Sequence, residues 1–225
     1  MTQRRYEYAP AGSLPGLLQR GRGLGARMAA EDPSSATGLV LGCIRWDWRW
    51  DAQVDHRHLY LTRLVRDLDL EGTILPRDGE RACDNDVTTA TRPLPDLLDA
   101  LEQHWVDQAW CGPAALARQL AEYGPEAAAA ASLLRRFWLH TPHSYERAAY
   151  LEALAEVAPT GLGEIHVECL WDCEPNSRLL GIEHAPDRPE VRQRLAYLRD
   201  DPMEEPAVRA AARERGQRPG MRPLR

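Results

Sequence analysis

The most constraining feature of the sequence is the regular recurrence of proline and glycine in its second half. From residue 93 onward, breaks such as Gly112-Pro113 and Gly124-Pro125 interrupt the apolar segments every 12–20 residues. Proline suits the first position of a helix because its ring fixes φ and it has no N–H, and a preceding glycine can end the earlier helix. Further breaks of this kind are Thr141-Pro142, Pro159-Thr160-Gly161, Pro175-Asn176, Arg188-Pro189 and Glu205-Pro206. The spacing predicts short helices joined by tight turns, so that successive helices run antiparallel.

The apolar residues between these breaks follow a helical period. Leu61, Leu64, Val65 and Leu68 stand at i, i+3, i+4 and i+7, which places them on one face of a helix. The same stripe recurs at Leu97, Leu98, Leu101 and Trp105, and at Tyr150, Leu151, Leu154 and Val157. Alternating β-branched runs and hairpin turns are nearly absent. The pattern predicts an all-α protein.

Short antiparallel helical hairpins cannot bury both faces alone, so they stack and share a continuous core. Residues 192–202 give a helix that ends in Asp-Pro, and residues 206–212 give a second helix with a Val-Arg-x-Ala-Ala core. Residues 29–33 and 36–41 repeat this arrangement more faintly. In these segments the chain resembles HEAT repeats. The resemblance implies a short α-solenoid of stacked antiparallel hairpins.

The domain organisation follows from where the helical pattern begins, pauses and ends. We expect a flexible basic N-terminus over residues 1–13, one helical-repeat domain over 14–215, and a disordered basic tail over 216–225. A stretch rich in turn-forming residues at 71–92 predicts a long loop within that domain.

The charges of the chain limit its chemistry and its partners. All 28 basic residues are arginine, so no lysine is present to serve as a Schiff-base nucleophile or a phosphate-loop cation. Residues 28–206 hold 17 arginines against 32 acidic residues, a net charge of −15, which disfavours binding to a nucleic-acid backbone. The sequence has no apolar run long enough for a membrane span and no signal-peptide pattern, and we expect a cytoplasmic location with no membrane partner.

The first candidate site is a possible metal site on an expected helix over residues 163–173. His166, Cys169 and Cys173 stand at i, i+3 and i+7, so three metal-ligand residue types share one face. A fourth ligand would come from elsewhere, such as His140 or His143. The favoured alternative is that both thiols are core residues, because the Cys-x-x-Cys spacing of structural zinc sites is missing. The prediction is therefore no resident cofactor, with a metal ion as the alternative.

The second candidate site is the tryptophan segment, Trp46-Asp47-Trp48-Arg49-Trp50-Asp51. Exposed tryptophans can anchor a partner protein or stack on bases. A period of two does not fit one face of a helix, so we expect these rings to line a helix end or a turn. The favoured alternative is that Trp46 and Trp50 fill the junction between two hairpins; if any ring is exposed, we expect Trp46, Trp48, Arg49, Trp50 and Asp51 to bind a partner.

No catalytic signature is present, and no nucleophile can be placed beside the Asp55-His56 pair. The sequence favours a non-enzymatic interaction or scaffold protein that binds a partner protein or peptide through a concave face and the tryptophan segment. One alternative is suggested by HEAT-like enzymes that excise alkylated bases from DNA with a carboxylate and tryptophans, residue types that the tryptophan segment supplies. The acidic body opposes that alternative. The other alternative is a metal- or thiol-dependent protein that uses His166, Cys169 and Cys173.

Overall fold

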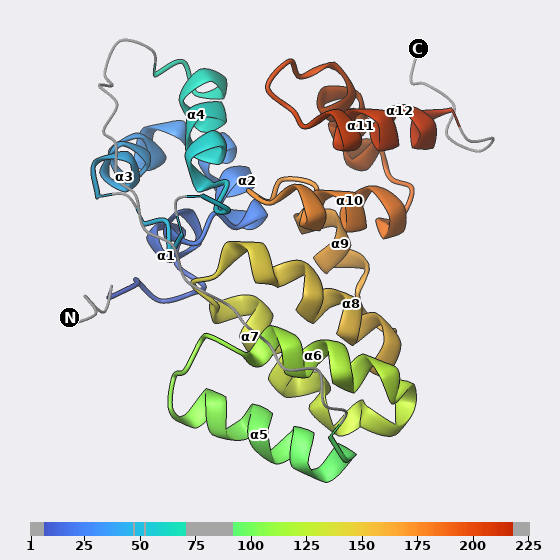
Figure 1. Cartoon of the computed structure of the whole chain (residues 1–225). Helices are drawn as coiled ribbons and strands as arrows, with labels where there is room; N and C mark the ends of the chain where they lie inside the picture. The colour runs from blue at the N-terminus through green and yellow to red at the C-terminus, as the bar shows by residue number, and fades with distance from the viewer. Residues whose placement is uncertain (1–6, 47, 52, 71–91, 218–225) are drawn as a thin grey trace. The chain divides into compact units, whose positions relative to one another are not determined.

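The computed structural model describes residues 7–46, 48–51, 53–70 and 92–217. These residues form twelve α-helices and two 3₁₀ helices, with no strand among them, which confirms the all-α prediction (Figure 1). No helix in this part of the chain is long and apolar enough to cross a membrane. The expected loop at 71–92 lies outside the described residues except for Arg92, as do residues 1–6 of the N-terminus and 218–225 of the tail.

The chain divides into two compact units. Unit 1 consists of residues 1–49, 56–78 and 163–225, and unit 2 consists of residues 50–55 and 79–162. The single domain expected over 14–215 stays a prediction, because two compact units can still belong to one folding domain.

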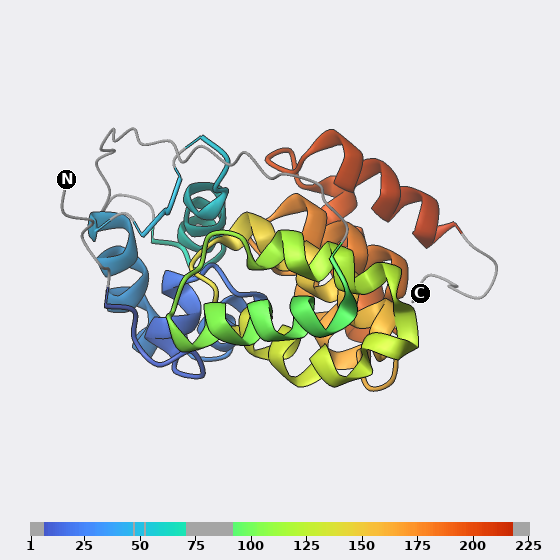
Figure 2. The same ribbon diagram turned by 60° about the horizontal axis from the view of Figure 1, so that its bottom comes forward.

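Unit 1 joins helices from both ends of the chain. Its N-terminal helices are α1 (Leu14–Gln19), α2 (Gly23–Glu31), α3 (Pro33–Trp46) and α4 (Arg57–Asp67). Its C-terminal helices are α9 (Gly163–Cys169), α10 (Pro175–His184), α11 (Pro189–Asp200) and α12 (Pro206–Gly216). Helices next to each other in the chain pack together, as α11 and α12 do in both ribbon views (Figures 1 and 2).

Unit 2 is built from one continuous stretch of helices. They are α5 (Leu94–Val106), α6 (Pro113–Glu122), η1 (Gly124–Ala130), α7 (Ala131–His140), η2 (Ser144–Glu146) and α8 (Arg147–Val157). Helix α8 packs against α6 and α7, and α5 packs against α6. Aromatic rings occupy the interior: Phe137 is fully buried, and its ring centroid lies 5.6 Å from that of Tyr150 and 5.5 Å from that of Trp105.

Most of the predicted helix starts are confirmed. Helices α6, α10, α11 and α12 each begin at a proline, as the proline breaks predicted. Three starts differ. Gly124-Pro125 opens a 3₁₀ helix, and after Pro159-Thr160-Gly161 the next helix begins at Gly163. No helix begins at Thr141-Pro142: Thr141 follows the last residue of α7, and its hydroxyl accepts a hydrogen bond from the N–H of His143 in a turn.

The helix expected over residues 163–173 is shorter than predicted. Helix α9 ends at Cys169, and Cys173 lies in the turn before Pro175, where its N–H donates to the carbonyl of Gly21 at 3.0 Å. This bond replaces a helical one, and Pro175 disfavours helical geometry at the residue before it. The three residues before Cys173 already leave the α-helical pattern, because their N–H groups bond to carbonyls three residues back, and the bond to Gly21 then fixes the turn.

The interior of unit 1 combines two apolar clusters with buried ion pairs. One cluster joins α1–α4 with Cys173, and the other joins α9–α12. Arg22 and Glu168, both buried, form a two-bond pair at 2.7 and 2.9 Å. Arg63 Nε donates to Asp201 Oδ2 at 3.1 Å. Both pairs connect a helix of the N-terminal group with a residue of the C-terminal group.

Candidate functional site

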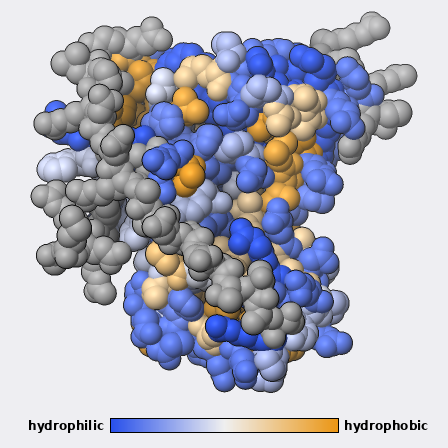
Figure 3. Space-filling model, in the orientation of Figure 1, coloured by the Kyte–Doolittle hydropathy of each residue, from blue (hydrophilic) through white to orange (hydrophobic). Residues whose placement is uncertain are grey.

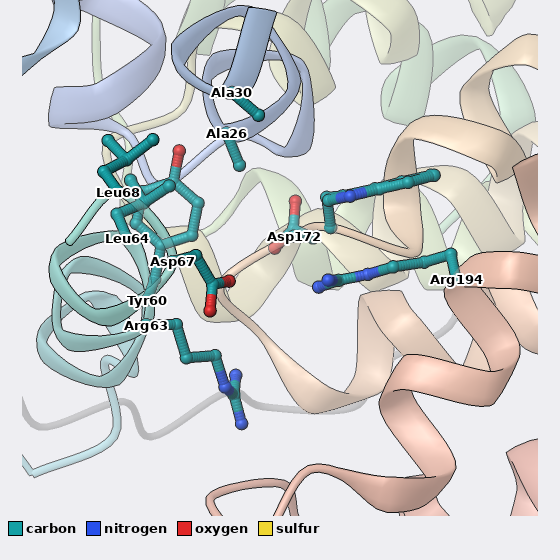
Figure 4. Close-up of a pocket in the computed structure, with 10 residues that line it drawn as sticks. Ala26, Ala30, Tyr60, Arg63, Leu64, Asp67, Leu68, Asp172 and Arg194 are labelled. Atoms are coloured by element: carbon teal, nitrogen blue, oxygen red, sulfur yellow. The ribbon is translucent and has the colours of Figure 1, made fainter. Parts of the chain in front are cut away.

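A pocket opens in unit 1 between α2, α4, the turn after α9, and α11. About 70 Å³ of it is open to water-sized molecules, which is room for a few waters or one amino-acid side chain. We call it the arginine–tryptophan pocket. Its lining residues are Ala26, Ala30, Tyr60, Arg63, Leu64, Asp67, Leu68, Trp171, Asp172 and Arg194 (Figure 4).

One part of the lining is apolar. Ala26 and Ala30 stand four residues apart on α2, and Leu64 and Leu68 stand four residues apart at the end of α4, so each pair shares one helix face. The alanines are small enough to leave the space between the two helices unfilled. This part of the pocket can hold an apolar group.

The other part of the lining is an aromatic ring that carries two arginines. The guanidinium carbon of Arg194 lies 5.1 Å from the ring centroid of Trp171, and that of Arg27 lies 5.3 Å from it. Arg194 also lies over the ring of Tyr197, at 4.1 Å. Distances of this size are typical of cation–π contacts. The indole of Trp171 therefore contacts two positive charges: Arg194, which lines the pocket, and Arg27, which lies against the same ring but is not one of the lining residues.

Neither of these two guanidinium groups forms a salt bridge with a carboxylate in the described part of the chain. The Nε of Arg194 donates to the backbone carbonyl of Leu170 at 3.1 Å, which fixes the direction of the side chain. Burial lowers the pKa of Arg194 to about 10, because the charged form is partly removed from water. Arg194 therefore stays positively charged at neutral pH, and an anion beside it would offset the lost hydration.

The remaining charged groups of the pocket already have partners. Arg63 donates to Asp201, and Asp67 accepts hydrogen bonds from Arg66 at 3.0 Å and from the hydroxyl of Tyr197 at 2.8 Å. The buried Asp172 accepts from the N–H of Glu174 at 2.9 Å. In the close-up, the side chains of Asp67 and Arg194 extend into the pocket from opposite sides (Figure 4). Arg194 and Arg27 are thus the cations that remain available to a ligand.

The structure places the tryptophan segment in three different environments. Trp46 is the last residue of α3 and is 71% exposed. Trp48 is half-buried on the N-terminal core of unit 1, where its ring lies 5.1 Å from that of Tyr8 and its carbonyl accepts the Tyr8 hydroxyl. Trp50 belongs to unit 2, where its ring centroid lies 4.6 Å from that of His143.

The two polar members of the segment that the structure describes are less accessible than a binding role requires. Arg49 is half-buried, and Asp51 is buried with its Oδ1 accepting the N–H of Gln53 at 2.9 Å. Asp47 lies outside the described residues. Trp46 is therefore the ring of this segment that is most open to a partner.

The three predicted metal ligands lie in unit 1 and are largely enclosed. Cys169 and Cys173 are fully buried, and Cys173 is part of the N-terminal core cluster. His166 is buried, and its ring lies 5.1 Å from that of His184. Burial and the neighbouring charge of His184 lower the pKa of His166 to about 4. Among the described residues, no group of three or more His, Cys, Asp or Glu side chains is placed to hold a metal ion.

Unit 2 contains a second polar cluster, formed by Cys111, His143 and Glu146, which we call the Cys–His–Glu cluster. Cys111 is exposed, His143 is completely buried and Glu146 is buried. Nδ1 of His143 lies 3.4 Å from Oε2 of Glu146. Burial works against a charge on His143, but contacts with the Cys111 thiol and the Glu146 carboxylate outweigh it and raise the pKa of the imidazole.

The sequence did not predict either the arginine–tryptophan pocket or the Cys–His–Glu cluster. Trp171 lies between the two cysteines considered as metal ligands, and Arg194 lies in the segment that resembles a HEAT repeat, but they meet only when α9 and α11 pack in one unit. His143 was considered solely as a fourth metal ligand. The pairing of Cys111 with His143, 32 positions later, has no signature in the sequence.

Comparison with protein-family models, with curated proteins and with solved structures gives no match for this chain. The functional conclusion therefore rests on the geometry of the arginine–tryptophan pocket and the Cys–His–Glu cluster.

Proposed function

We propose that the protein is a non-enzymatic binding module that takes an acidic segment of a partner protein or peptide at the arginine–tryptophan pocket. The observation that carries this proposal is the pair of guanidinium groups, Arg27 and Arg194, held on the ring of Trp171 without a carboxylate partner among the described residues. In a chain with a net charge of −6, arginines without a salt bridge to a carboxylate beside an aromatic ring favour an anionic ligand.

The chemistry of the pocket suggests how such a segment binds. A carboxylate of the segment accepts hydrogen bonds from Arg194 or Arg27, and a neighbouring apolar side chain enters between Ala26, Ala30 and Leu64. The volume of the pocket suits one side chain and not a large cofactor. The site thus fits a short peptide motif that combines an acidic and an apolar residue.

We also propose that the helices form HEAT-like hairpins stacked as a short α-solenoid. The support comes from the order of contacts: α11 packs with α12, α9 with α10 and α5 with α6, so pairs that are adjacent in the chain are adjacent in space. The HEAT-like segment at 192–212 corresponds to α11 and α12, with Asp201 between them. A solenoid of this kind commonly serves as a surface for a partner.

Trp46 is a second candidate contact for the partner, because a tryptophan that is 71% exposed at a helix end is available as an anchor. A nucleic-acid partner is less favoured. Arg22, Arg57, Arg147 and Arg178 are fully buried and are not available to phosphates, and the body of the chain is acidic.

The proposal can be tested by selecting random heptapeptides displayed on phage against the full chain. We expect the selected peptides to be enriched in Asp or Glu next to an apolar residue. Arg194→Gln should then weaken the binding of such a synthetic peptide by about 10- to 100-fold, since a hydrogen bond to a charged group contributes about 1.5–3 kcal/mol. Trp171→Leu should weaken it as well, because the ring positions both arginines.

The matched control is Arg199→Gln, the same change on the same helix, at a side chain that is 43% exposed and paired with Asp200. This variant should bind the peptide as the wild-type chain does. Selected peptides without acidic residues, or equal affinity of the wild type and Arg194→Gln, would contradict the proposal. Trp46→Ala, measured with the same peptide, shows whether the exposed ring contributes.

A further inference from the structure

The Cys–His–Glu cluster of unit 2 is independent of the binding site proposed above. Cys111 stands two residues before the start of α6, in the turn that follows α5. The next residue, Gly112, has φ +108°, and a Cβ atom there would lie 3.2 Å from Cε1 of His104. The backbone at this point therefore depends on glycine, and it holds the exposed thiol in a defined position.

The position of His143 is also fixed by its neighbours. The ring of His143 lies between neighbours on two sides, with the Trp50 centroid at 4.6 Å and the stacked Tyr145 centroid at 5.4 Å. Its backbone is fixed by the hydrogen bond from its N–H to the hydroxyl of Thr141. The imidazole is thus fixed by packing on both sides. Burying a polar ring costs more free energy than burying an apolar side chain of similar size, so filling space does not explain a histidine here.

The two ring nitrogens of His143 are consistent with a role in proton transfer. The side chain is completely buried, and neither ring nitrogen makes a hydrogen bond of normal geometry with a described residue. Glu146 Oε2 lies just outside that range at 3.4 Å from Nδ1, and this carboxylate is itself held by the hydroxyl of Tyr150 at 3.2 Å. The imidazole also lies against the Cys111 thiol. A buried nitrogen without a hydrogen-bond partner costs free energy, so packing alone does not account for an imidazole at this position.

We propose that Cys111 is a histidine-activated nucleophile that reacts with low-molecular-weight disulfides, with Glu146 orienting His143. A nucleophilic thiol needs a base within reach and a group that orients the base, and the cluster supplies these in the order Cys111, His143, Glu146. Thiol–disulfide exchange needs no further group, because the proton taken from the attacking thiol is returned to the leaving thiolate.

The reaction is balanced as follows. His143 takes the proton of the Cys111 thiol, and the thiolate sulfur attacks one sulfur of the disulfide RS–SR. The S–S bond of RS–SR breaks, a new S–S bond joins Cys111 to R–S, and the displaced RS⁻ takes the proton from His143 and leaves as RSH. The small disulfide is reduced and Cys111 is oxidised. The other described cysteines, Cys43, Cys169 and Cys173, are buried in unit 1.

The test measures how fast Cys111 forms a mixed disulfide with oxidised glutathione, by mass spectrometry of the peptide that contains it. The chain carries Cys83→Ser so that this thiol does not compete. We expect the rate constant of Cys111 to exceed that of a synthetic peptide spanning residues 107–115 by at least roughly tenfold, within the range that general-base assistance provides. A rate constant in the protein equal to or below that of the peptide would overturn the proposal, and this comparison needs no substitution at the cluster.

The role of His143 is tested with His143→Gln, checked for its helical content by circular dichroism. We expect the rate to fall roughly 10- to 100-fold and its dependence on pH to change, because no imidazole is then present to take the proton of the thiol. His184→Gln is the matched control, the same change at a ring that is about half exposed. Glu146→Gln should give an intermediate rate. A folded His143→Gln chain with the wild-type rate and pH profile would also overturn the proposal.

Discussion

Different interactions stabilise the interiors of the two units. Unit 1 must join helices from residues 14–67 with helices from residues 163–216, and buried ion pairs such as Arg22–Glu168 and Arg63–Asp201 span this gap. Unit 2 is formed by nearly contiguous helices, and its interior is organised by aromatic contacts around Phe137. In the space-filling view, hydrophilic residues predominate among the coloured atoms, with patches of apolar residues between them (Figure 3).

The comparison shows what directional interactions add to apolar packing. Apolar surfaces attract one another without fixing register, whereas an arginine that must meet one carboxylate accepts a single arrangement. Segments far apart in the chain have many ways to meet wrongly, so unit 1 gains most from such pairs. The free energy of a buried pair is small when charge burial is counted, but removing one partner alone is strongly destabilising.

The largest effect is expected at Arg178 in unit 1. This fully buried side chain donates to Glu204 at 2.6 Å and to the carbonyls of Asp172 and Cys173 at 2.8 and 2.7 Å. Arg178→Met should lower the free energy of unfolding by about 3–5 kcal/mol, because it leaves two carbonyls buried without their donor and removes the shortest ion pair of the Glu204 carboxylate, which keeps Arg63 at 3.4 Å. Urea denaturation measures it. Arg199→Met, at the exposed Asp200 pair, is the control that should change little, and an equally mild Arg178→Met would break the comparison.

The second prediction concerns the response of unit 1 to acid. The pKa of His166 is lowered to about 4, so the unfolded chain, with an ordinary histidine pKa of about 6.5, binds the proton first as the pH falls. The stability associated with His166 is therefore full above about pH 6.5 and is lost between there and pH 4, by about 2 kcal/mol after allowance for partial solvent access. In His166→Asn this part of the pH dependence of the melting temperature should disappear. An unchanged pH profile would show that His166 is already exposed in the folded chain.

Phe137 tests the aromatic interior of unit 2. Phe137→Leu keeps an apolar side chain but removes the ring contacts with Trp105, Trp110 and Tyr150. We expect a loss of about 1–2 kcal/mol, which thermal or urea unfolding can measure. This loss should not vary with salt, since no charge is involved. A strong dependence on ionic strength would mean that charged groups, and not rings, hold this interior.

The smallest effect is expected at His143, and its sign is opposite to that at His166. Its pKa is raised in the folded chain, so the stability it contributes is full below the unfolded value of about 6.5 and is lost as the pH rises through the folded pKa. The effect is small because burial works against the charge. Melting curves of the wild type and His143→Gln between pH 6 and 9 should converge as the pH rises, and curves that diverge would reverse the sign assigned to this group.

Much of the local structure could be predicted from the sequence. The prolines at 113, 175, 189 and 206 each begin a helix, and the stripe at Leu61, Leu64 and Val65 is buried in the N-terminal core of unit 1. These features depend on φ restriction and on helical periodicity, which act over a few residues. The turn after α9 could not be predicted in this way, because it includes a hydrogen bond between Cys173 and Gly21, 152 positions apart.

The candidate sites show the same limit more strongly. The sequence indicated Trp46 as a candidate anchor, and the structure leaves this ring exposed. It also indicated Cys169 and Cys173 as thiols on an apolar face, and both are buried. It gave no sign that Arg27 and Arg194 share the ring of Trp171, or that Cys111 meets His143. Such pairings depend on which helices pack together.

The sequence by itself determined that this protein is helical, where four of its helices begin, and that no lysine takes part in its chemistry. The tertiary structure alone decided which arginines are buried in ion pairs and which remain available at a pocket. The physical reason is distance along the chain. Backbone preferences act between near neighbours, whereas the arrangement of charges and rings at a site is set by the packing of helices that the sequence keeps far apart.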